Sequence, residues 1–238
     1  MIEKVISSNI FSPIIHRYSL AFAEIDTQEP IILDVGGYSS RKTIADEFFN
    51  SLTYTSINIG NAWYQDVSAD ILYDGFNIPF ENNSFDYVIS VDVLEHVTKM
   101  KRLRVISEIV RVASKRAVVV TPFRLPGVET DESYILDICE RYGIVSPPSL
   151  VEHELYGLPL LSDIEEYVSA LGGTYKYATN KKDYWSLQTA MLWNTISLNG
   201  DSERINREVQ KLQEEQLKSQ PYPQNAKNAY RCVMIFDK

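Results

Sequence analysis

Side chains that can do acid–base chemistry follow one apolar segment of the chain. Residues 85–91 read Phe-Asp-Tyr-Val-Ile-Ser-Val and come just before Asp92, Glu95 and His96. A second histidine, His153, lies between two glutamates further along the chain. An imidazole titrates near neutral pH and can take a proton from a hydroxyl or an amine. We therefore regard His96 and His153 as candidate catalytic bases.

Each of these side chains also has another interpretation. His96 could fix a helix to a sheet by hydrogen bonds, and His16, on the first predicted helix, is expected to be structural. Asp92 and His96 are four residues apart, so a helix would place them on one face with Glu95 beside them. Two carboxylates and two imidazoles, counting His153, are also a plausible ligand set for a divalent metal. The pattern is frequent in enzymes without metal, and we expect none here.

A second chemical feature is the heptapeptide 31–37, which reads Ile-Ile-Leu-Asp-Val-Gly-Gly. An apolar run that ends in a carboxylate and two glycines predicts a buried parallel strand that turns sharply into a helix. Gly36 and Gly37 let backbone come close to a ligand, and Asp34 can accept hydrogen bonds from it. Many α/β proteins without a cofactor have such a turn, so the heptapeptide alone does not decide.

The elements that must position these groups alternate between strands and helices. Apolar, β-branched and aromatic runs predict strands over 31–35, 54–59, 70–73, 85–91, 117–121, 174–178 and 230–236. Apolar residues at helical spacing predict helices from Ser12 to Ile25, through Ile44 and Phe48, over 101–113, from a capping box at Ser162 to Leu171, and over 202–218. This order predicts an α/β fold with a doubly wound, mostly parallel sheet.

The regular alternation stops at Pro122. Residues 124–161 are loop-like and contain several prolines and aromatic residues. We expect them to form an excursion, or lid, over the active-site end of the sheet, within a single domain of residues 1–238. His153 lies in this excursion. Its part from 134 to 161 is the expected contact for an acceptor substrate, although most aromatic residues of the second half are expected to fill the core.

Composition excludes several classes of protein. The chain has 238 residues, of which 45% are hydrophobic and 23% charged, as in ordinary soluble domains. Its net charge of −9 argues against a nucleic-acid partner, and the basic run over 99–104 is expected to be the solvated start of a helix. No apolar stretch suggests a membrane span, and the first residues lack a signal pattern. Two cysteines suit a reducing cytoplasm. A homodimer remains open.

The stretch over 74–97 carries a family resemblance, since it reads DGFNIPFENNSFDYVISVDVLEHV. Together with Leu-Asp-Val-Gly-Gly upstream, it resembles the class I S-adenosylmethionine-dependent methyltransferases, and within them the large small-molecule subgroup. The match runs from about 31 to 123, and the strand over 230–236 fits the antiparallel last strand of a Rossmann-like, seven-stranded sheet. The resemblance implies transfer of a methyl group from S-adenosylmethionine to an O or N of a small-molecule acceptor, such as a sugar or a secondary metabolite.

The resemblance also implies which residues contact the methyl donor. Seven are expected there: Asp34, Gly36 and Gly37 at its amino-acid end, Asn58 at the ribose, Asp74 and Gly75 at the adenine, and Asp92 near the site of transfer. Asn58 stands where the family usually has Asp or Glu, and Tyr38 stands where it usually has a glycine-like residue. The donor site therefore departs from the family pattern.

Three alternatives remain beside a methyltransferase without metal. The departures at Asn58 and Tyr38 would suit a catalytically inactive module that binds the donor and acts as a regulator or scaffold. An NAD-dependent oxidoreductase is less suited, because the Gly-x-Gly-x-x-Gly pattern is absent. Asp92, Glu95 and the two histidines resemble the metal site of the small-RNA 3′-end 2′-O-methyltransferases, but the acidic charge of the chain does not suit an RNA substrate.

Overall fold

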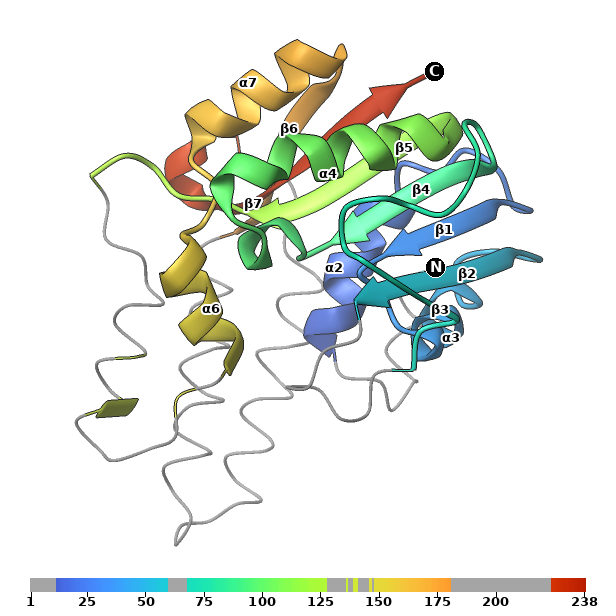
Figure 1. Cartoon of the computed structure of the whole chain (residues 1–238), viewed down its shortest axis with the longest axis horizontal. Coiled ribbons are helices and arrows are strands. Elements are labelled where there is room, and N and C mark those ends of the chain that lie inside the picture. The colour runs from blue at the N-terminus through green and yellow to red at the C-terminus, as the bar shows by residue number, and fades with distance from the viewer. Residues whose placement is uncertain are drawn as a thin grey trace, which may run out of the picture.

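The computed structural model describes residues 12–59, 68–127, 136, 139–140, 146, 148–180 and 224–238. Seven strands form one sheet in the order β3-β2-β1-β4-β5-β7-β6 (Figure 1). Their bounds are β1 Ile31–Val35, β2 Thr53–Ile59, β3 Ile71–Tyr73, β4 Phe85–Val91, β5 Ala113–Pro122, β6 Thr174–Asn180 and β7 Ala229–Asp237. β7 runs antiparallel to β5 and β6, while β1 to β5 pair in parallel. The predicted α/β fold with an antiparallel last strand is confirmed.

Helices cover both faces of the sheet. They are α2 Ser12–Phe22, α3 Lys42–Ala45, α4 Lys99–Val112, α6 Pro148–Tyr156 and α7 Leu161–Leu171, with the short 3-10 helices η1 Ser39–Arg41, η2 Leu94–His96 and η3 Ala226–Asn228. In Figure 1, α4 and α7 lie on one face, and α2 and α3 on the other. Among the helices of the described residues, none has the length and hydropathy needed to cross a bilayer.

The alternation of side chains along β1 divides the core into two layers. Leu33 packs with Ile106 of α4, whereas its neighbour Ile32 packs with Ile15 of α2 on the opposite face. All four side chains are almost completely buried. Because successive strand residues point to opposite faces, an unbroken apolar run is what a strand covered on both sides requires.

Two predicted helices have other bounds in the structure. The helix after the glycine turn is only η1 and one turn of α3, so Phe48 lies beyond its end. The helix predicted to have Ser162 as its N-cap residue begins two residues earlier. Leu160 is its N-cap residue, and the Asp163 carboxylate accepts a hydrogen bond of 3.1 Å from the Leu160 N–H. That bond satisfies one of the backbone donors that a helix start leaves open.

Other predictions differ at the ends of elements. α2 ends at Phe22 rather than Ile25, and β5 begins at Ala113 because it follows α4 directly. The helix predicted over 202–218 lies outside the described residues. The basic run over 99–104 is not wholly solvated, because Arg102 is only 1% exposed.

The excursion over 124–161 closes on itself. The Arg124 N–H donates to the Pro159 carbonyl at 2.9 Å, and the Leu161 N–H donates to the Arg124 carbonyl at 3.1 Å. Between these ends the chain contains α6, which contacts η2 just after β4. Figure 1 shows α6 beyond the carboxyl ends of the central strands. The segment from 128 to 135, with Tyr134, lies outside the described residues.

Candidate functional site

The glycine turn after β1 is packed too closely for any side chain. A Cβ at Gly36 would lie 2.3 Å from Cγ2 of Val93, and Gly36 has a φ of +86°. A Cβ at Gly37 would lie 1.9 Å from Oδ2 of Asp34. Glycine is required at both positions, first for its left-handed backbone and then for contact. The turn thereby lies directly against the start of η2.

Asp34 is completely buried beneath this turn, and only one of its oxygens is satisfied. Oδ2 accepts a hydrogen bond from the Tyr18 hydroxyl at 2.7 Å and another from the Tyr54 hydroxyl. Among the described residues, Oδ1 has no hydrogen-bond partner. Burial raises the pKa of Asp34 to about 6, against the opposing effect of the two tyrosine hydrogen bonds. The second carboxylate oxygen is therefore available to accept a hydrogen bond from a ligand.

Tyr18 and Tyr54 were missed by the sequence analysis. Tyr54 lies opposite Ile32 in the parallel register of β1 and β2, on the same face as Asp34. Within the sequence pattern, only this pairing of β1 with β2 indicates that the Tyr54 side chain lies near Asp34. Tyr18 comes from α2, and only the packing of that helix on the sheet brings its hydroxyl to the carboxylate.

Asn58 supports the glycine turn in this structure. Its amide nitrogen donates to the carbonyls of Gly36 and Gly37 at 3.0 and 3.3 Å, and its Oδ1 accepts from the Ile59 N–H at 2.8 Å. A carboxylate has no hydrogen to donate and could not make the first two bonds. The amide at this position thus suits a role in holding the turn.

Asp74 and Gly75 form a turn next to the end of β2. Asp74 Oδ1 accepts hydrogen bonds from the N–H groups of Phe76 and Asn77, each at 2.7 Å. Gly75 has a φ of +84°, and a Cβ there would lie 2.9 Å from Cγ2 of Ile59. The Asp74 side chain is exposed at this edge of the sheet. Gly75 lies against Ile59, the residue after Asn58, so the predicted pair lies near Asn58.

Asp92 lies in a cluster of ion pairs. Its carboxylate accepts from Arg17 at 2.9 Å and from two nitrogens of Arg231 at 2.9 and 2.8 Å. Burial alone would raise the pKa of Asp92, but Arg231 and Arg17 outweigh it and hold that pKa well below its usual value. Neither arginine was singled out in the sequence. His16 is buried nearby and shares a hydrogen bond of 3.2 Å with Thr179.

Asp92 does not share a helical face with His96, contrary to expectation. It has a φ of +52° and precedes the 3-10 helix η2, which begins at Leu94. Since the backbone turns at Asp92, its carboxylate faces α2 and β7 while the side chains of Glu95 and His96 face α6. Of the four side chains proposed as a group, Asp92 is therefore separate, and the other three remain together.

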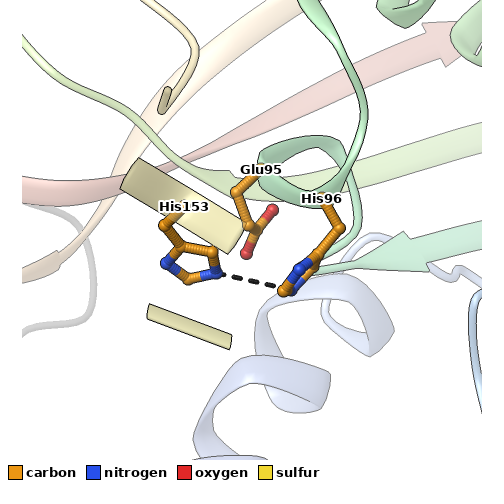
Figure 2. Close-up of side chains that lie close together, drawn as sticks. All are labelled: Glu95, His96 and His153. Atoms are coloured by element: carbon orange, nitrogen blue, oxygen red, sulfur yellow. Dashed lines mark hydrogen bonds between the residues drawn. The ribbon is translucent and has the colours of Figure 1, made fainter. Parts of the chain in front are cut away.

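The other three come together at the carboxyl end of β4. Figure 2 shows the side chains of Glu95, His96 and His153 pointing toward one another. Nε2 of His153 lies 3.3 Å from Nε2 of His96, and one potential ligand atom from each of the three residues lies within 4.8 Å of the others. Nδ1 of His96 donates to the Glu152 carboxylate at 2.7 Å. A histidine so held presents Nε2 to the site.

Glu95 is the buried member of this group. It is 1% exposed, and its Oε2 accepts a hydrogen bond from the Thr121 hydroxyl at 3.3 Å. Burial first, and then the charge of Asp92, raise the pKa of Glu95 to about 8. The carboxyl group thus lies where a nearby positive charge would stabilise its ionised form.

Arg102 joins the two segments that carry the histidines. Its Nε donates to the carbonyls of Leu94 and Val97 at 2.9 Å each, and its terminal nitrogen donates to those of Tyr156 and Gly157. The first two carbonyls belong to η2 and its end, and the second two to the end of α6. This buried guanidinium therefore fixes α6 against η2.

Comparison with known families assigns the segment that follows the glycine turn. Residues 40–121, from η1 into β5, match the family model described as a methyltransferase domain. The segment is therefore similar to a methyltransferase domain, and the sheet as a whole has the Rossmann-like fold of S-adenosylmethionine-dependent methyltransferases. No curated protein sequence matches the chain significantly.

Solved structures share this methyltransferase fold at low sequence identity. An S-adenosylmethionine-dependent methyltransferase from Archaeoglobus fulgidus has 12% identity and a TM-score of 0.51, with 100% of this chain and 95% of that chain covered. Phosphoethanolamine N-methyltransferase 2 from Haemonchus contortus has 15% identity and a TM-score of 0.55, over 94% of this chain and 52% of that one. Geranyl diphosphate C-methyltransferase from Streptomyces coelicolor has 11% identity and a TM-score of 0.53, over 92% and 78%.

Proposed function

We propose that this methyltransferase domain transfers the methyl group of S-adenosylmethionine to an oxygen or nitrogen of a small-molecule acceptor. The observation that carries the proposal is the buried Asp34 Oδ1, which has no partner among the described residues. The ammonium group of the donor would supply the missing hydrogen bond and a compensating charge. We infer that residues 1–238 act as one domain, with 124–161 as its acceptor-side excursion.

The residues around Asp34 suit the amino-acid end of the donor. Gly36 and Gly37 leave no side chain between backbone and ligand, and Asn58 holds both of their carbonyls. Asp74 and Gly75, near the end of β2, are proposed to receive the adenine. Asp92 is proposed to act indirectly, because two arginines already occupy its carboxylate.

The acceptor would lie next to the histidine pair. Val93 packs on Gly36, so η2, which contains His96, adjoins the proposed donor turn. His153 lies beside His96. We propose that the Nε2 side of this pair receives the proton that the acceptor loses. The sulfonium is already activated, and so catalysis would depend chiefly on holding the acceptor atom in line with the methyl group.

The fold neighbours support a small-molecule acceptor. The Haemonchus enzyme was solved with phosphomonomethylethanolamine and S-adenosylhomocysteine, and the Streptomyces enzyme with geranyl diphosphate and S-adenosylhomocysteine. The net charge of −9 disfavours a nucleic acid in that place.

A turnover screen tests the proposal. The purified protein would be incubated with S-adenosylmethionine and pools of hydroxylated or amine-bearing small molecules, with mass spectrometry of S-adenosylhomocysteine and of methylated products. We expect product in at least one pool, and its loss in His153→Ala. Donor binding without turnover in any pool would favour the regulatory module instead. Absence of donor binding at millimolar concentration would contradict both.

A further inference from the structure

We propose that Glu95, His96 and His153 form a binding site for a divalent transition-metal ion. The sequence analysis raised a metal site only as an alternative, expected none, and grouped Asp92 with these residues; the structure removes Asp92 from the group. The inference deepens the proposed function, on which its catalytic part rests, because the cation would occupy the acceptor side of the methyl donor.

The separation of the two imidazole nitrogens suits one shared cation. Nε2 of His96 and Nε2 of His153 are 3.3 Å apart. With metal–nitrogen bonds of about 2.1 Å, two nitrogens lie about 3.0 Å apart at octahedral angles and about 3.4 Å apart at tetrahedral angles. The observed distance falls between these values. The two nitrogens face each other in Figure 2, with the Glu95 carboxyl group beside them.

Glu95 would be the third ligand, because of its position and its burial. One oxygen of its buried carboxyl group lies within 4.8 Å of a ring nitrogen of each histidine, so one cation could lie between the three groups. A buried carboxylate is costly without a cation beside it. Two imidazoles and one carboxylate are the ligands that Fe²⁺, Co²⁺, Mn²⁺ and Zn²⁺ accept with further positions left open.

Glu152 orients one of the ligands. It accepts the Nδ1–H of His96 at 2.7 Å, which leaves Nε2 of that ring with its lone pair toward His153. Carboxylates commonly hold metal-binding histidines in this way, and their loss weakens metal binding about 10- to 100-fold. The His96 and Glu152 side chains are 29% and 25% exposed, so solvent reaches both of them.

A cation here would favour an oxygen acceptor over a nitrogen. A hydroxyl oxygen bound to the metal loses its proton to water more easily and still has a lone pair for attack, whereas a bound amine has used its only one. The oxygen lone pair forms the new O–CH3 bond as the C–S bond breaks, and the bonding electrons stay on sulfur as S-adenosylhomocysteine leaves. The cation would then replace His96 and His153 as the group that activates the acceptor.

Titration with Co²⁺ tests the site directly. Full-length protein would be freed of metal with a chelator, and its visible absorption followed as Co²⁺ is added. We expect one equivalent to bind with the spectrum of nitrogen–oxygen coordination. His153→Ala and Glu95→Gln should lose that binding, and Glu152→Gln should weaken it about 10- to 100-fold. Glu154→Gln, an exposed neighbour on α6, is the matched control and should bind as the wild type does.

S-adenosylhomocysteine binding, measured by calorimetry on the same metal-free samples, shows that each variant is folded and separates the two proposals. Protein that binds S-adenosylhomocysteine but takes up Co²⁺ no better than His153→Ala overturns the metal site and leaves the methyltransferase proposal standing. Protein that binds Co²⁺ as expected but no S-adenosylhomocysteine contradicts the proposed function alone.

Discussion

At the scale of single residues, the site depends on Asp34 and its asymmetric surroundings. One carboxylate oxygen is held by two tyrosine hydroxyls, and the other has no partner among the described residues. The sequence predicted Asp34 as a contact of the methyl donor, since a carboxylate shortly before two glycines is a local pattern. It could not place Tyr18, because 16 residues and the packing of a whole helix separate that hydroxyl from Asp34.

Donor affinity should depend on the protonation of Asp34. Its pKa is raised to about 6, so the carboxylate is mostly neutral at pH 5 and mostly ionised at pH 7. Only the ionised form attracts an ammonium group. We predict that S-adenosylhomocysteine binds about tenfold more tightly at pH 7 than at pH 5, as measured by calorimetry. An affinity that is flat over this range would contradict the contact.

The ligand-free protein should show the opposite trend in stability. Because the folded pKa of Asp34 lies above the unfolded value of 3.8, its contribution to the free energy of unfolding is complete below pH 3.8 and is lost as pH rises through 6. At about 1.4 kcal/mol per pH unit, the loss is about 3 kcal/mol. Asp34→Asn, which cannot ionise, should lack this loss in denaturant unfolding, and an identical pH profile for both proteins would refute it.

Asn58→Asp distinguishes support of the turn from contact with a ribose. The aspartate would face the carbonyls of Gly36 and Gly37 with oxygens in place of donors. We predict a loss of about 1–3 kcal/mol in the free energy of unfolding, together with weaker S-adenosylhomocysteine binding. Tighter binding, as a charged ribose acceptor would give, would show instead that Asn58 contacts the ligand.

At the scale of elements, the proposed acceptor side is built from η2 and α6, held together by Arg102. The sequence analysis took the basic run at 99–104 as solvated, and for Arg102 this was wrong. The helical pattern contained the signal, because position 102 lies on the same stripe as Val105, Ile106 and Ile109, all buried. Its four carbonyl partners lie on two separate segments, which no local pattern shows.

Removal of Arg102 should loosen the histidine pair more than the donor turn. Arg102→Met leaves buried carbonyls of η2 and α6 without donors, and we predict a loss of about 2–4 kcal/mol in the free energy of unfolding. Below the melting transition, methyl transfer should fall far more than S-adenosylhomocysteine affinity. The control is Arg104→Met, exposed on the same helix, which should change stability by about 0.5 kcal/mol or less.

Equal losses of methyl transfer and S-adenosylhomocysteine affinity in Arg102→Met would contradict a positioning role for this residue. Unchanged stability would contradict the importance of its four hydrogen bonds.

At the scale of the whole molecule, the sheet brings the candidate groups to one edge. Asp34, Asn58 and Glu95 come from the carboxyl ends of β1, β2 and β4 or the turn that follows, where ligands of open α/β sheets bind. The sequence predicted this edge because strand runs are local and parallel strands end together. It did not predict that Arg17 and Arg231 would occupy Asp92, since those contacts depend on α2 and β7 packing around it.

The closure of the excursion is a further property of the whole chain. Arg124 pairs with Pro159 and Leu161, so a segment that the sequence showed only as irregular begins and ends at one point. This closure sets α6, and with it His153, beside η2. The proposed acceptor side thus depends on tertiary contacts, whereas the glycine turn of the proposed donor side is encoded within seven residues and is then supported by Tyr18, Tyr54 and Asn58.

The central claim is that Asp34 holds the amino-acid end of the methyl donor. Its most direct test is calorimetry of S-adenosylhomocysteine with the wild type, Asp34→Ala and the exposed control Asp46→Asn at pH 7.5. We predict saturable binding to the wild type and the control, and a loss of at least about tenfold in affinity for Asp34→Ala, since a charge-assisted hydrogen bond is removed. Undiminished affinity in folded Asp34→Ala would contradict the claim.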